Sequence, residues 1–254
     1  MKEKTGEILL EEYLVAHLDF LGAKNLIFES EKIFISNLLK AIDKAKELVQ
    51  RYQRKTYNRI TYNFRIFSDN ICIYIKCAKS SGDTTGNLRA YNEMLAIIRF
   101  VMSFQYTCFV NFGLFMRGGI AKGSLFINED LIIGKALVEA HYLESKKADY
   151  PRILISNSIC EFMKANNDYE SFFRSSIRKD YDGHHMASYL EICMDEGYPI
   201  KVQLLLHKEN LIIRLKNASN IKIKNKILSL IKYHNTFCSE LKPSFPEALI
   251  EPPH

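Results

Sequence analysis

The order of its first six segments is the feature of this sequence that most restricts its fold. Apolar residues alternate along residues 11–19 like a buried strand, and they recur at three- to four-residue spacing along residues 23–53 like a helix. Two short apolar runs that meet at a tight turn, a second helical pattern and a glycine-containing strand follow, at residues 62–67, 70–76, 88–108 and 113–127. This order is that of the ferredoxin-like βαββαβ arrangement, which predicts an α+β fold.

Two aspartates stand at the ends of these strands. Asp19 ends the first apolar run, and Asp69 lies in the tight turn between the second and third strands. A carboxylate at the end of a buried strand is costly unless a cation meets it. In the βαββαβ arrangement the first strand lies beside the central hairpin, so the two carboxylates should face each other. Because hard divalent cations prefer oxygen ligands, the pair predicts a metal site.

The overall composition is that of a globular protein. The chain has 254 residues, of which 47% are hydrophobic and 25% charged, and its formal net charge is +6. The basic residues do not form one dense block, so we expect no nucleic-acid partner and regard a polyphosphate ligand as compatible with the charge. We expect a cytoplasmic protein without a membrane partner, because no apolar run reaches the roughly 18 residues of a membrane span. The six cysteines are scattered and are expected to be reduced.

The rest of the chain predicts further alternation and then helices only. A helix at 135–147, a strand at 151–156, a helix at 157–165 and a strand pair within 177–192 precede two helices at 199–217 and 221–241. The tail at 243–254 contains four prolines and is expected to be irregular. We therefore divide the chain into a catalytic domain at residues 1–195 and a helical C-terminal extension with an irregular tail at 196–254.

Several short motifs resemble a known family when they are taken in order. They are Asp19-Phe20-x-Gly22, Phe67-Ser68-Asp69-Asn70, Arg117-Gly118-Gly119-Ile120-Ala121-x-Gly123, Gly134-x-x-Leu137-x-x-Ala140-x-x-Leu143-Glu144-Ser145 and Tyr150-Pro151-Arg152-Ile153. Over about residues 12–192 the chain resembles the class III nucleotidyl cyclases. It is most similar to the pyrimidine cyclases of the bacterial Pycsar anti-phage systems.

The resemblance implies an activity and its cofactors. Enzymes of this family convert a nucleoside triphosphate into a 3′,5′-cyclic monophosphate and pyrophosphate, with two Mg²⁺ or Mn²⁺ ions between two aspartates. Asp19 and Asp69 would be these metal ligands and the catalytic residues, with the backbone carbonyl of Phe20 as a third ligand. Because family sites form between two subunits, a homodimer is also implied.

The resemblance also implies where the triphosphate binds. The backbone amides of residues 20–24, which lead into a helix, would hold the phosphates. These residues are Phe20, Leu21, Gly22, Ala23 and Lys24. Gly22 would be needed because a side chain would obstruct close approach. Arg117, Lys122 and Lys179 are further candidates for phosphate contact, and Lys179 is the nearest match to the lysine of the family's late hairpin.

Two positions that decide base choice in this family carry Arg65 and Leu131. An arginine offers only hydrogen-bond donors, so it could reach O2 or O4 of a pyrimidine or N3 of cytosine. A leucine opposite it gives no polar partner for a purine edge. This favours UTP or CTP as substrate without separating the two, and we favour UTP because uridylate cyclases are the commoner type among the resembling proteins.

The chain departs from the family pattern in the helix after Gly134. The family carries there a ribose-orienting asparagine and a transition-state arginine, and the matching positions are Val138 and Tyr142. Loss of such a charged donor typically raises the barrier by a few kcal/mol. Either another cation substitutes, with Lys135, Arg117 and Arg178 as candidates, or the rate of the reaction is low.

Three functions are therefore weighed. The first is a pyrimidine cyclase whose cyclic UMP or cyclic CMP is a second messenger that activates an effector in anti-phage defence. The second is a non-catalytic nucleotide-binding sensor on a degenerate cyclase fold, which Val138 and Tyr142 favour. The third is a palm-type polymerase or diguanylate cyclase, which ranks low because Ser68-Asp69-Asn70 contains no adjacent acidic pair.

Overall fold

The computed structural model describes residues 8–53, 60–78, 84–166, 176–194, 199–242 and 244–251. The boundary between residues 195 and 196, residue 243 and residues 252–254 of the predicted tail lie outside these ranges. The elements are β1 (Glu11–Leu21), α1 (Ala23–Gln53), β2 (Asn63–Phe67), β3 (Asn70–Lys76), α2 (Thr84–Phe112), β4 (Phe115–Ile127), β5 (Ile132–Ile133), α3 (Lys135–Tyr142), η1 (Leu143–Lys147), β6 (Ile153–Ile155), α4 (Asn157–Ala165), β7 (Ile177–Lys179), β8 (His185–Ala187), η3 (Tyr189–Met194), α6 (Ile200–Lys216), α7 (Ile221–Glu240) and η4 (Pro246–Ala248).

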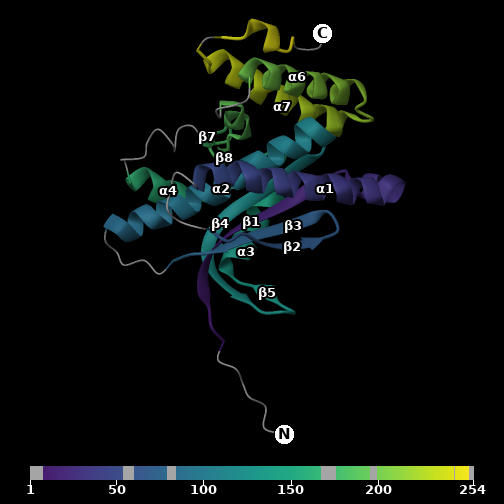
Figure 1. Ribbon diagram of the computed structural model, residues 1–254. Coiled ribbons are helices and arrows are strands. Elements are labelled where there is room, and N and C mark those ends of the chain that lie inside the picture. The colour runs from purple at the N-terminus through teal and green to yellow at the C-terminus, as the bar shows by residue number, and fades with distance from the viewer. Residues whose placement is uncertain are drawn as a thin grey trace.

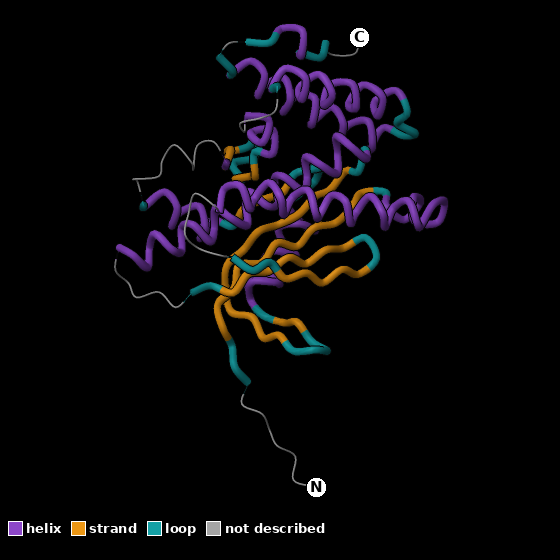
Figure 2. The backbone as a smooth tube through the Cα atoms, viewed as in Figure 1, coloured by secondary structure: helices purple, strands orange, loops and turns teal. Residues whose placement is uncertain are grey.

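The strands form one mixed sheet in the order β2-β3-β1-β4-β6-β8-β7, with β5 paired to β4 (Figure 2). β1 lies between β3 and β4 and is antiparallel to both, while β6 runs parallel to β4. The order β2-β3-β1-β4, with α1 and α2 as the connecting helices, is the ferredoxin-like arrangement. The predicted α+β fold and its first six elements are therefore confirmed.

Helices cover the sheet unequally on its two faces. Alternate residues of β1, from Leu14 to Phe20, pack in the main core with α1 and α2, which lie across the sheet in Figure 1. The intervening residues point to the other face, where Val15 packs with Ala136 and Ala140 of α3. Because side chains alternate along a strand, His17 and Asp19 share this second face.

Helix α2 is the central core helix. It is long and apolar enough to span a membrane, but 72% of its most apolar stretch is buried inside the protein. Phe100 and Phe104 of α2 are fully buried, and the Phe20 ring packs edge-on against Phe104 at 6.1 Å between centroids. The apolar side chains of α2 thus pack in the core of the protein.

The C-terminal helices α6 and α7 pack on the far end of α2 and lie beside the C-terminus in Figure 1. Leu204 of α6 and Phe237 of α7 belong to the main core, and Phe109 of α2 contributes to a smaller cluster with Leu211. The division into residues 1–195 and 196–254 stays a prediction. In the structure the extension shares its core with the preceding elements.

Two helices differ from their predicted form. Helix α1 has the predicted bounds, but Ser30 (φ −159°, ψ 61°) interrupts it. The helix expected at 135–147 is α-helical only to Tyr142, and residues 143–147 form a π-helical turn. A five-residue π-turn has too few side chains for its period to be distinguished in a sequence from that of an α-helix.

Candidate functional site

Asp19 lies near the end of β1, between two neighbouring strands. It is paired in register with Asn70 of β3 and with Arg117 of β4. Its side chain points to the α3 face and is largely buried. The carboxylate therefore needs a positive or hydrogen-bonding partner from the same row of the sheet.

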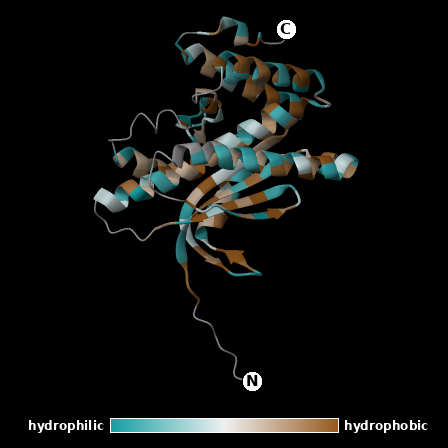
Figure 3. Cartoon of the chain, in the orientation of Figure 1, coloured by the Kyte–Doolittle hydropathy of each residue, from teal (hydrophilic) through white to brown (hydrophobic). Residues whose placement is uncertain are grey.

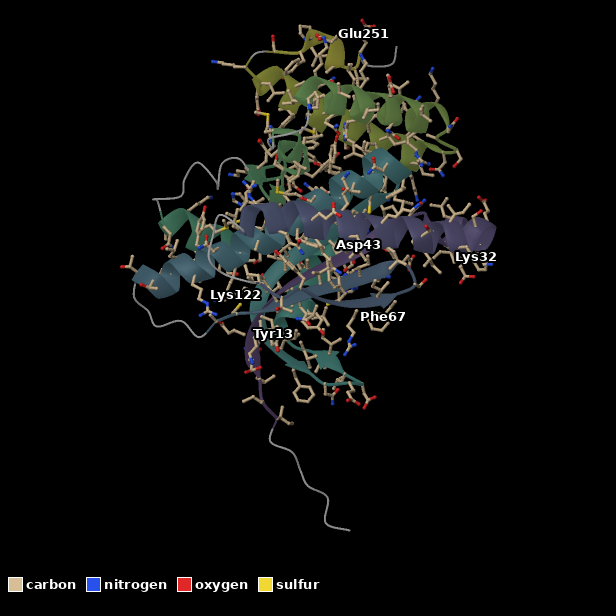
Figure 4. All side chains as sticks on the ribbon, viewed as in Figure 1. Tyr13, Lys32, Asp43, Phe67, Lys122 and Glu251 are labelled. Atoms are coloured by element: carbon tan, nitrogen blue, oxygen red, sulfur yellow. The ribbon has the colours of Figure 1, made fainter. Side chains whose placement is uncertain are left out.

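Asp69 occupies the turn between β2 and β3 and meets the end of β1. The backbone N–H of Phe20 donates to the carbonyl oxygen of Asp69 at 2.9 Å. The Asn70 amide donates to Asp69 Oδ1 at 3.2 Å. The structure thus brings Asp19 and Asp69 to the same end of the sheet, as the strand order predicts. Phe67 marks this end in Figure 4.

The turn itself is strained beside Asp69. Ser68 has φ of 56°, a left-handed conformation that non-glycine residues seldom adopt. Such conformations persist where the surrounding structure holds them, and they cluster at functional sites. Here the two flanking strands and the Phe20–Asp69 hydrogen bond hold the turn.

Arg117 contacts Asp19 and also a carboxylate that the sequence reasoning missed. Its Nε donates to Asp19 Oδ2 at 3.1 Å and lies 2.8 Å from Glu144 Oε1. Glu144 is only 3% exposed, and its Oε1 accepts no hydrogen bond from the described residues. The Arg117 Nε–H therefore lies between the carboxylates of Asp19 and Glu144. It donates a hydrogen bond to Asp19, whereas its contact with Glu144 is an ion pair.

Two histidines complete this charged cluster. Nδ1 of His17 and Nε2 of His141 each lie 3.9 Å from Glu144 Oε2, and the two rings pack edge to face at 5.1 Å. Burial, and then the nearby His141, lower the pKa of His17 to about 4, so this imidazole is neutral at pH 7. Burial raises the pKa of Glu144 and the negative Asp19 adds to the rise, while Arg117 and His141 oppose it.

A signal for the cluster was present in the sequence. His17 lies two residues before Asp19 on one strand, so the two side chains must share a face. Glu144 lies in the motif Leu143-Glu144-Ser145. That Glu144 meets Arg117 depends on how the π-helical turn packs on β4, which no local pattern specifies.

The two base-choice positions lie close together. Arg65 stands on β2 opposite Cys72 of β3, and Cys72 is in register with His17. Since partners in register project to the same face, Arg65 lies on the side of the sheet that carries Asp19. Its Nη2 donates to the carbonyl oxygen of Asn128 at 3.2 Å, in the turn that ends at Leu131.

The predicted phosphate-binding segment leads into α1 as expected. Phe20 and Ala23 are buried, whereas the Lys24 side chain is exposed. Gly22 has φ of +78°, and no protein atom lies within 4 Å of the position that a Cβ would take. This left-handed backbone conformation favours glycine, and the expected role of Gly22 in the close approach of a triphosphate stays a prediction. Leu21 is the last residue of β1.

Two predicted phosphate ligands do not join this end of the sheet. Lys122 follows Arg117 by five positions on β4, so it points to the opposite face and lies roughly 16 Å along the strand. Its Nζ forms an ion pair with Glu12 Oε2 at 3.0 Å, and Figure 4 shows it on the other side from Phe67. Lys179 is on β7, which the sheet order puts four strands from β1, a distance of roughly 19 Å.

The two departures from the family pattern are on the surface of α3. Val138 is 65% and Tyr142 49% exposed. Lys147 Nζ lies 5.7 Å from the centre of the Tyr142 ring. Of the three cations considered as replacements, Arg117 is held by Asp19 and Glu144, and Arg178 by Glu240 at 2.5 Å. Lys135 begins α3, next to Gly123 of β4.

No protein-family model matches the sequence, and no curated protein matches it. Solved structures are similar to it. The adenylyl cyclase CyaB from P. aeruginosa is 17% identical with a TM-score of 0.45, over 70% of this chain and 92% of that one.

A second solved structure has a similar extent. The monomeric guanylyl cyclase domain of the RhoGC fusion protein from the aquatic fungus Blastocladiella emersonii is 17% identical with a TM-score of 0.42, over 70% of this chain and 94% of that one. Because these TM-scores lie below 0.5, the ferredoxin-like topology rests on the strand order and register described above.

The donor set at the Asp19 end fits a divalent cation. The carboxylates of Asp19 and Asp69 supply the oxygen ligands that Mg²⁺ and Mn²⁺ prefer. The Arg117 guanidinium stands in for a cation at Asp19. Within the described ranges no group of three or more His, Cys, Asp or Glu side chains could hold a metal ion. Backbone carbonyls, water or substrate phosphates would therefore have to complete the coordination.

Proposed function

We propose that this protein is a class III-type nucleotide cyclase that converts a nucleoside triphosphate into its 3′,5′-cyclic monophosphate and pyrophosphate. The observation that carries the proposal is the meeting of Asp19 and Asp69 at one end of the sheet, joined through the Phe20–Asp69 hydrogen bond. The order of the motifs along the chain, which resembles that family, supports the same reaction. The similarity to adenylyl and guanylyl cyclase structures is in keeping with it.

In this proposal Asp19, Asp69 and the carbonyl of Phe20 hold two divalent cations, Mn²⁺ or Mg²⁺. Such ions lower the pKa of the attacking 3′-hydroxyl and neutralise the leaving pyrophosphate. The amides of residues 20–24 at the start of α1 bind the triphosphate. Because α1 is interrupted at Ser30, only its short first segment supplies a dipole here.

Arg117 has a different role from direct phosphate binding in this scheme. Its Nε–H neutralises Asp19 until a metal ion is bound, and Glu144 lies 2.8 Å away as the alternative partner. If Asp19 held a metal ion, Glu144 Oε1 would be the alternative acceptor for the Arg117 Nε–H, since it has no hydrogen bond among the described residues. The buried Glu144 thereby keeps Arg117 neutralised in both states.

For the substrate we propose a pyrimidine nucleotide, UTP ahead of CTP. Arg65 brings donors to the Asp19 face of the sheet, and the Asn128–Leu131 turn that it contacts ends at the apolar Leu131. That pairing suits a pyrimidine carbonyl and gives a purine edge no acceptor from Leu131. In keeping with the Pycsar resemblance, the product would be a cytoplasmic second messenger that activates an effector in anti-phage defence.

A homodimer would complete the site. Large apolar side chains are exposed on β2, on α3 and in the turn before β5, near the Asp19 face, and β5 itself is among the most hydrophobic elements in Figure 3. They are Phe67, Leu131, Val138 and Tyr142. Exposed apolar surface of this kind marks interaction sites. A second copy that covers it would bring further cations to the substrate.

The alternative function is a nucleotide-binding sensor without catalysis. Val138 and Tyr142 favour it, because neither position offers a ribose ligand or a transition-state cation.

One assay separates the two functions. Purified protein is incubated with each of the four nucleoside triphosphates and Mn²⁺, and cyclic products are separated by chromatography. We expect cyclic UMP, and no product from Asp69→Asn protein with an unchanged circular dichroism spectrum. Nucleotide binding without any product would instead establish the sensor. A purine product would refute the role of Arg65 in base choice.

A further inference from the structure

The hairpin formed by α6 and α7 has a one-sided charge. Residues 210–239, which run from the middle of α6 almost to the end of α7, contain no Asp or Glu but six Lys or Arg residues. Four of the six are lysines in residues 216–226, around the connection between the two helices, and we call this segment the hairpin tip. They are Lys216, Lys222, Lys224 and Lys226. Figure 1 shows the two helices side by side, with their connection at the edge of the molecule.

The start of α7 projects beyond the helix that it packs against. Every residue from Ser219 to Asn225 is exposed, so the first turn of α7 is open to solvent on all sides. Ile221 is 67% and Ile223 41% exposed. Because the side chains of a helix lean toward its N-terminus, those of the first turn of α7 point toward the tip. A flat surface that lies against the tip would therefore meet both isoleucines and the neighbouring lysines.

The protein does not neutralise the lysines of the hairpin tip. None of the four forms an ion pair with a residue that the structure describes. Glu247 and Glu251 line a cavity behind the tip together with Lys216 and Lys224. Glu247 is already paired with Lys201, whose Nζ lies 2.5 Å from Glu247 Oε1. Of the acids in the lining of this cavity, Glu251 is thus left to oppose four lysines, and the tip stays positive.

The lysines of the tip lie where they oppose the helix that carries them. The amino end of a helix favours acidic residues, yet the first turn of α7 has none. Lys222 and Lys226 are one turn apart, a spacing at which like charges repel. The helix start is capped by Asn220, whose side chain accepts from the Ile223 N–H at 3.0 Å. The fold gains nothing from the positive charge of this turn, whereas an anionic partner would explain it.

The composition of the hairpin tip distinguishes between anionic partners. Residues 216–226 contain no aromatic residue, on which nucleic-acid bases stack, and no arginine, which most often reads base edges. Two exposed isoleucines among lysines are instead the combination by which a helix rests in the headgroup layer of a membrane. Each lysine near an anionic leaflet strengthens binding about fivefold, and buried apolar side chains add to this. The tip therefore suits an anionic lipid surface better than a nucleic acid.

We propose that the hairpin tip binds the surface of a membrane that contains anionic lipids. Ile221 and Ile223 enter the headgroup layer, and the four lysines lie against lipid phosphates. No helix crosses the bilayer in this arrangement. The expectation of a protein without a membrane partner rested on the lack of a spanning segment, and it is here revised for surface binding. Because the tip belongs to the C-terminal helices, this role is independent of the proposed catalytic site at Asp19.

The test is flotation of the full chain with vesicles of phosphatidylcholine, alone or with about one third phosphatidylglycerol. We expect binding to the anionic vesicles only, and a large decrease when NaCl is raised from about 0.1 to 0.5 M, because salt screens exposed charges. Lys222→Gln should lower the partition coefficient about fivefold, and addition of Lys224→Gln should bring the loss to about 25-fold. Lys40→Gln, at an exposed lysine on α1, is the matched control and should change nothing.

A second pair of variants tests the apolar side chains. Ile221→Ser should lower vesicle binding about tenfold, the effect of exposing one large apolar side chain. Ile33→Ser, at a position on α1 that is 61% exposed, is the control and should bind as the unaltered protein does. Equal binding of Ile221→Ser and the unaltered protein would overturn the insertion of the tip.

Three further outcomes decide the proposal as a whole. Absence of binding to anionic vesicles, or binding that Lys222→Gln leaves unchanged, would overturn the site. Fluorescence polarisation of a labelled single-stranded RNA measures the competing ligand. RNA binding that the tip variants abolish, without vesicle binding by the unaltered protein, would assign the tip to nucleic acid. Asp69→Asn should float as the unaltered protein does, so the result does not depend on cyclase activity.

Discussion

At the scale of single residues, the site is governed by competition for one guanidinium. Arg117 lies within 3.1 Å of Asp19 Oδ2 and 2.8 Å of Glu144 Oε1, and its Nε carries one proton. In the proposed cyclase a metal ion and Arg117 compete for Asp19. Metal affinity should therefore depend on residues that need not touch the metal ion.

We predict opposite effects of two substitutions on Mn²⁺ affinity. Arg117→Gln should strengthen Mn²⁺ binding, because it removes the competing cation from Asp19. Glu144→Gln should weaken it, because Arg117 then has Asp19 as its only carboxylate. Each change should be about 1 to 2 kcal/mol, the scale of a partly buried charged contact.

Electron paramagnetic resonance of free Mn²⁺ in the absence of nucleotide measures both effects. Weakened binding in both variants would mean that Arg117 only supports the fold of the site. Absence of Mn²⁺ binding in the unaltered protein would instead refute the metal site, so the two failures are distinguishable.

At the scale of elements, the close packing of β4 on the junction of α3 and η1 sets the position of Glu144. A Cβ at Gly119 would lie 2.2 Å from the carbonyl oxygen of Ala140 and 2.6 Å from Leu143 Cβ. Residues 119 and 140 are far apart in sequence, so only the tertiary contact explains why glycine is needed at this position of the strand.

We predict that Gly119→Ala separates β4 from this junction. The free energy of unfolding should fall by about 1 to 3 kcal/mol, as for other overpacked sites, and Mn²⁺ affinity should change as Glu144 moves. Urea denaturation measures the first effect. Gly123→Ala is the matched control, since its nearest contact, the backbone nitrogen of Ala136, is at 3.2 Å and should cost less. Equal losses in both variants would contradict the argument.

At the scale of the whole molecule, a buried chain of hydrogen bonds joins η3 to the C-terminal helices α6 and α7 and to η4. His234 Nε2 lies 2.8 Å from the carbonyl oxygen of Ala248, so this nitrogen is the donor. Its Nδ1 then accepts from His207 Nδ1 at 3.0 Å, and His207 Nε2 accepts from the Tyr189 hydroxyl at 2.8 Å. The chain of bonds requires both imidazoles to be neutral.

We predict that this chain makes stability depend on pH. Burial lowers the pKa of both histidines in the folded protein, and for His207 the neighbouring His234 adds to the effect. The unfolded chain therefore takes up protons first as the pH falls below about 6.5. The stabilisation is complete above that pH and is lost below it.

The measurement is the free energy of unfolding between pH 7.5 and 5.5 in the unaltered protein and in His207→Gln. Below pH 6.5 the unaltered protein should lose about 1.4 kcal/mol per pH unit more than the variant, for one proton fewer taken up. Burial raises the pKa of Glu191 to about 7, so Glu191 also makes stability depend on pH. Its contribution cancels in the difference between the free energies of unfolding of the two proteins. Parallel curves would contradict the prediction.

The proposed homodimer gives a prediction at the same scale. Val138→Glu puts a charge on the exposed apolar surface beside the site, so it should convert dimer to monomer and abolish cyclase activity without loss of fold. Ile213→Glu, at an apolar position on α6 that is also more than half exposed, is the control. Analytical ultracentrifugation distinguishes the two states, and an unaltered sedimentation coefficient in Val138→Glu would exclude this interface.

By itself the sequence determined the order of elements and, through it, the approach of Asp19 to Asp69. Periodicity is a local property, and a βαββαβ order leaves few ways to arrange the strands. Alternation along β4 also separates Arg117 from Lys122, since residues five positions apart must face opposite sides.

Only the tertiary structure decided what surrounds the two aspartates. The Glu144 partner of Arg117 and the neutral His17 both depend on contacts between segments distant in sequence. Register, burial and the packing of α3 on β4 create those contacts. A local pattern specifies the face on which a side chain lies, whereas the partner that it meets there depends on the whole fold.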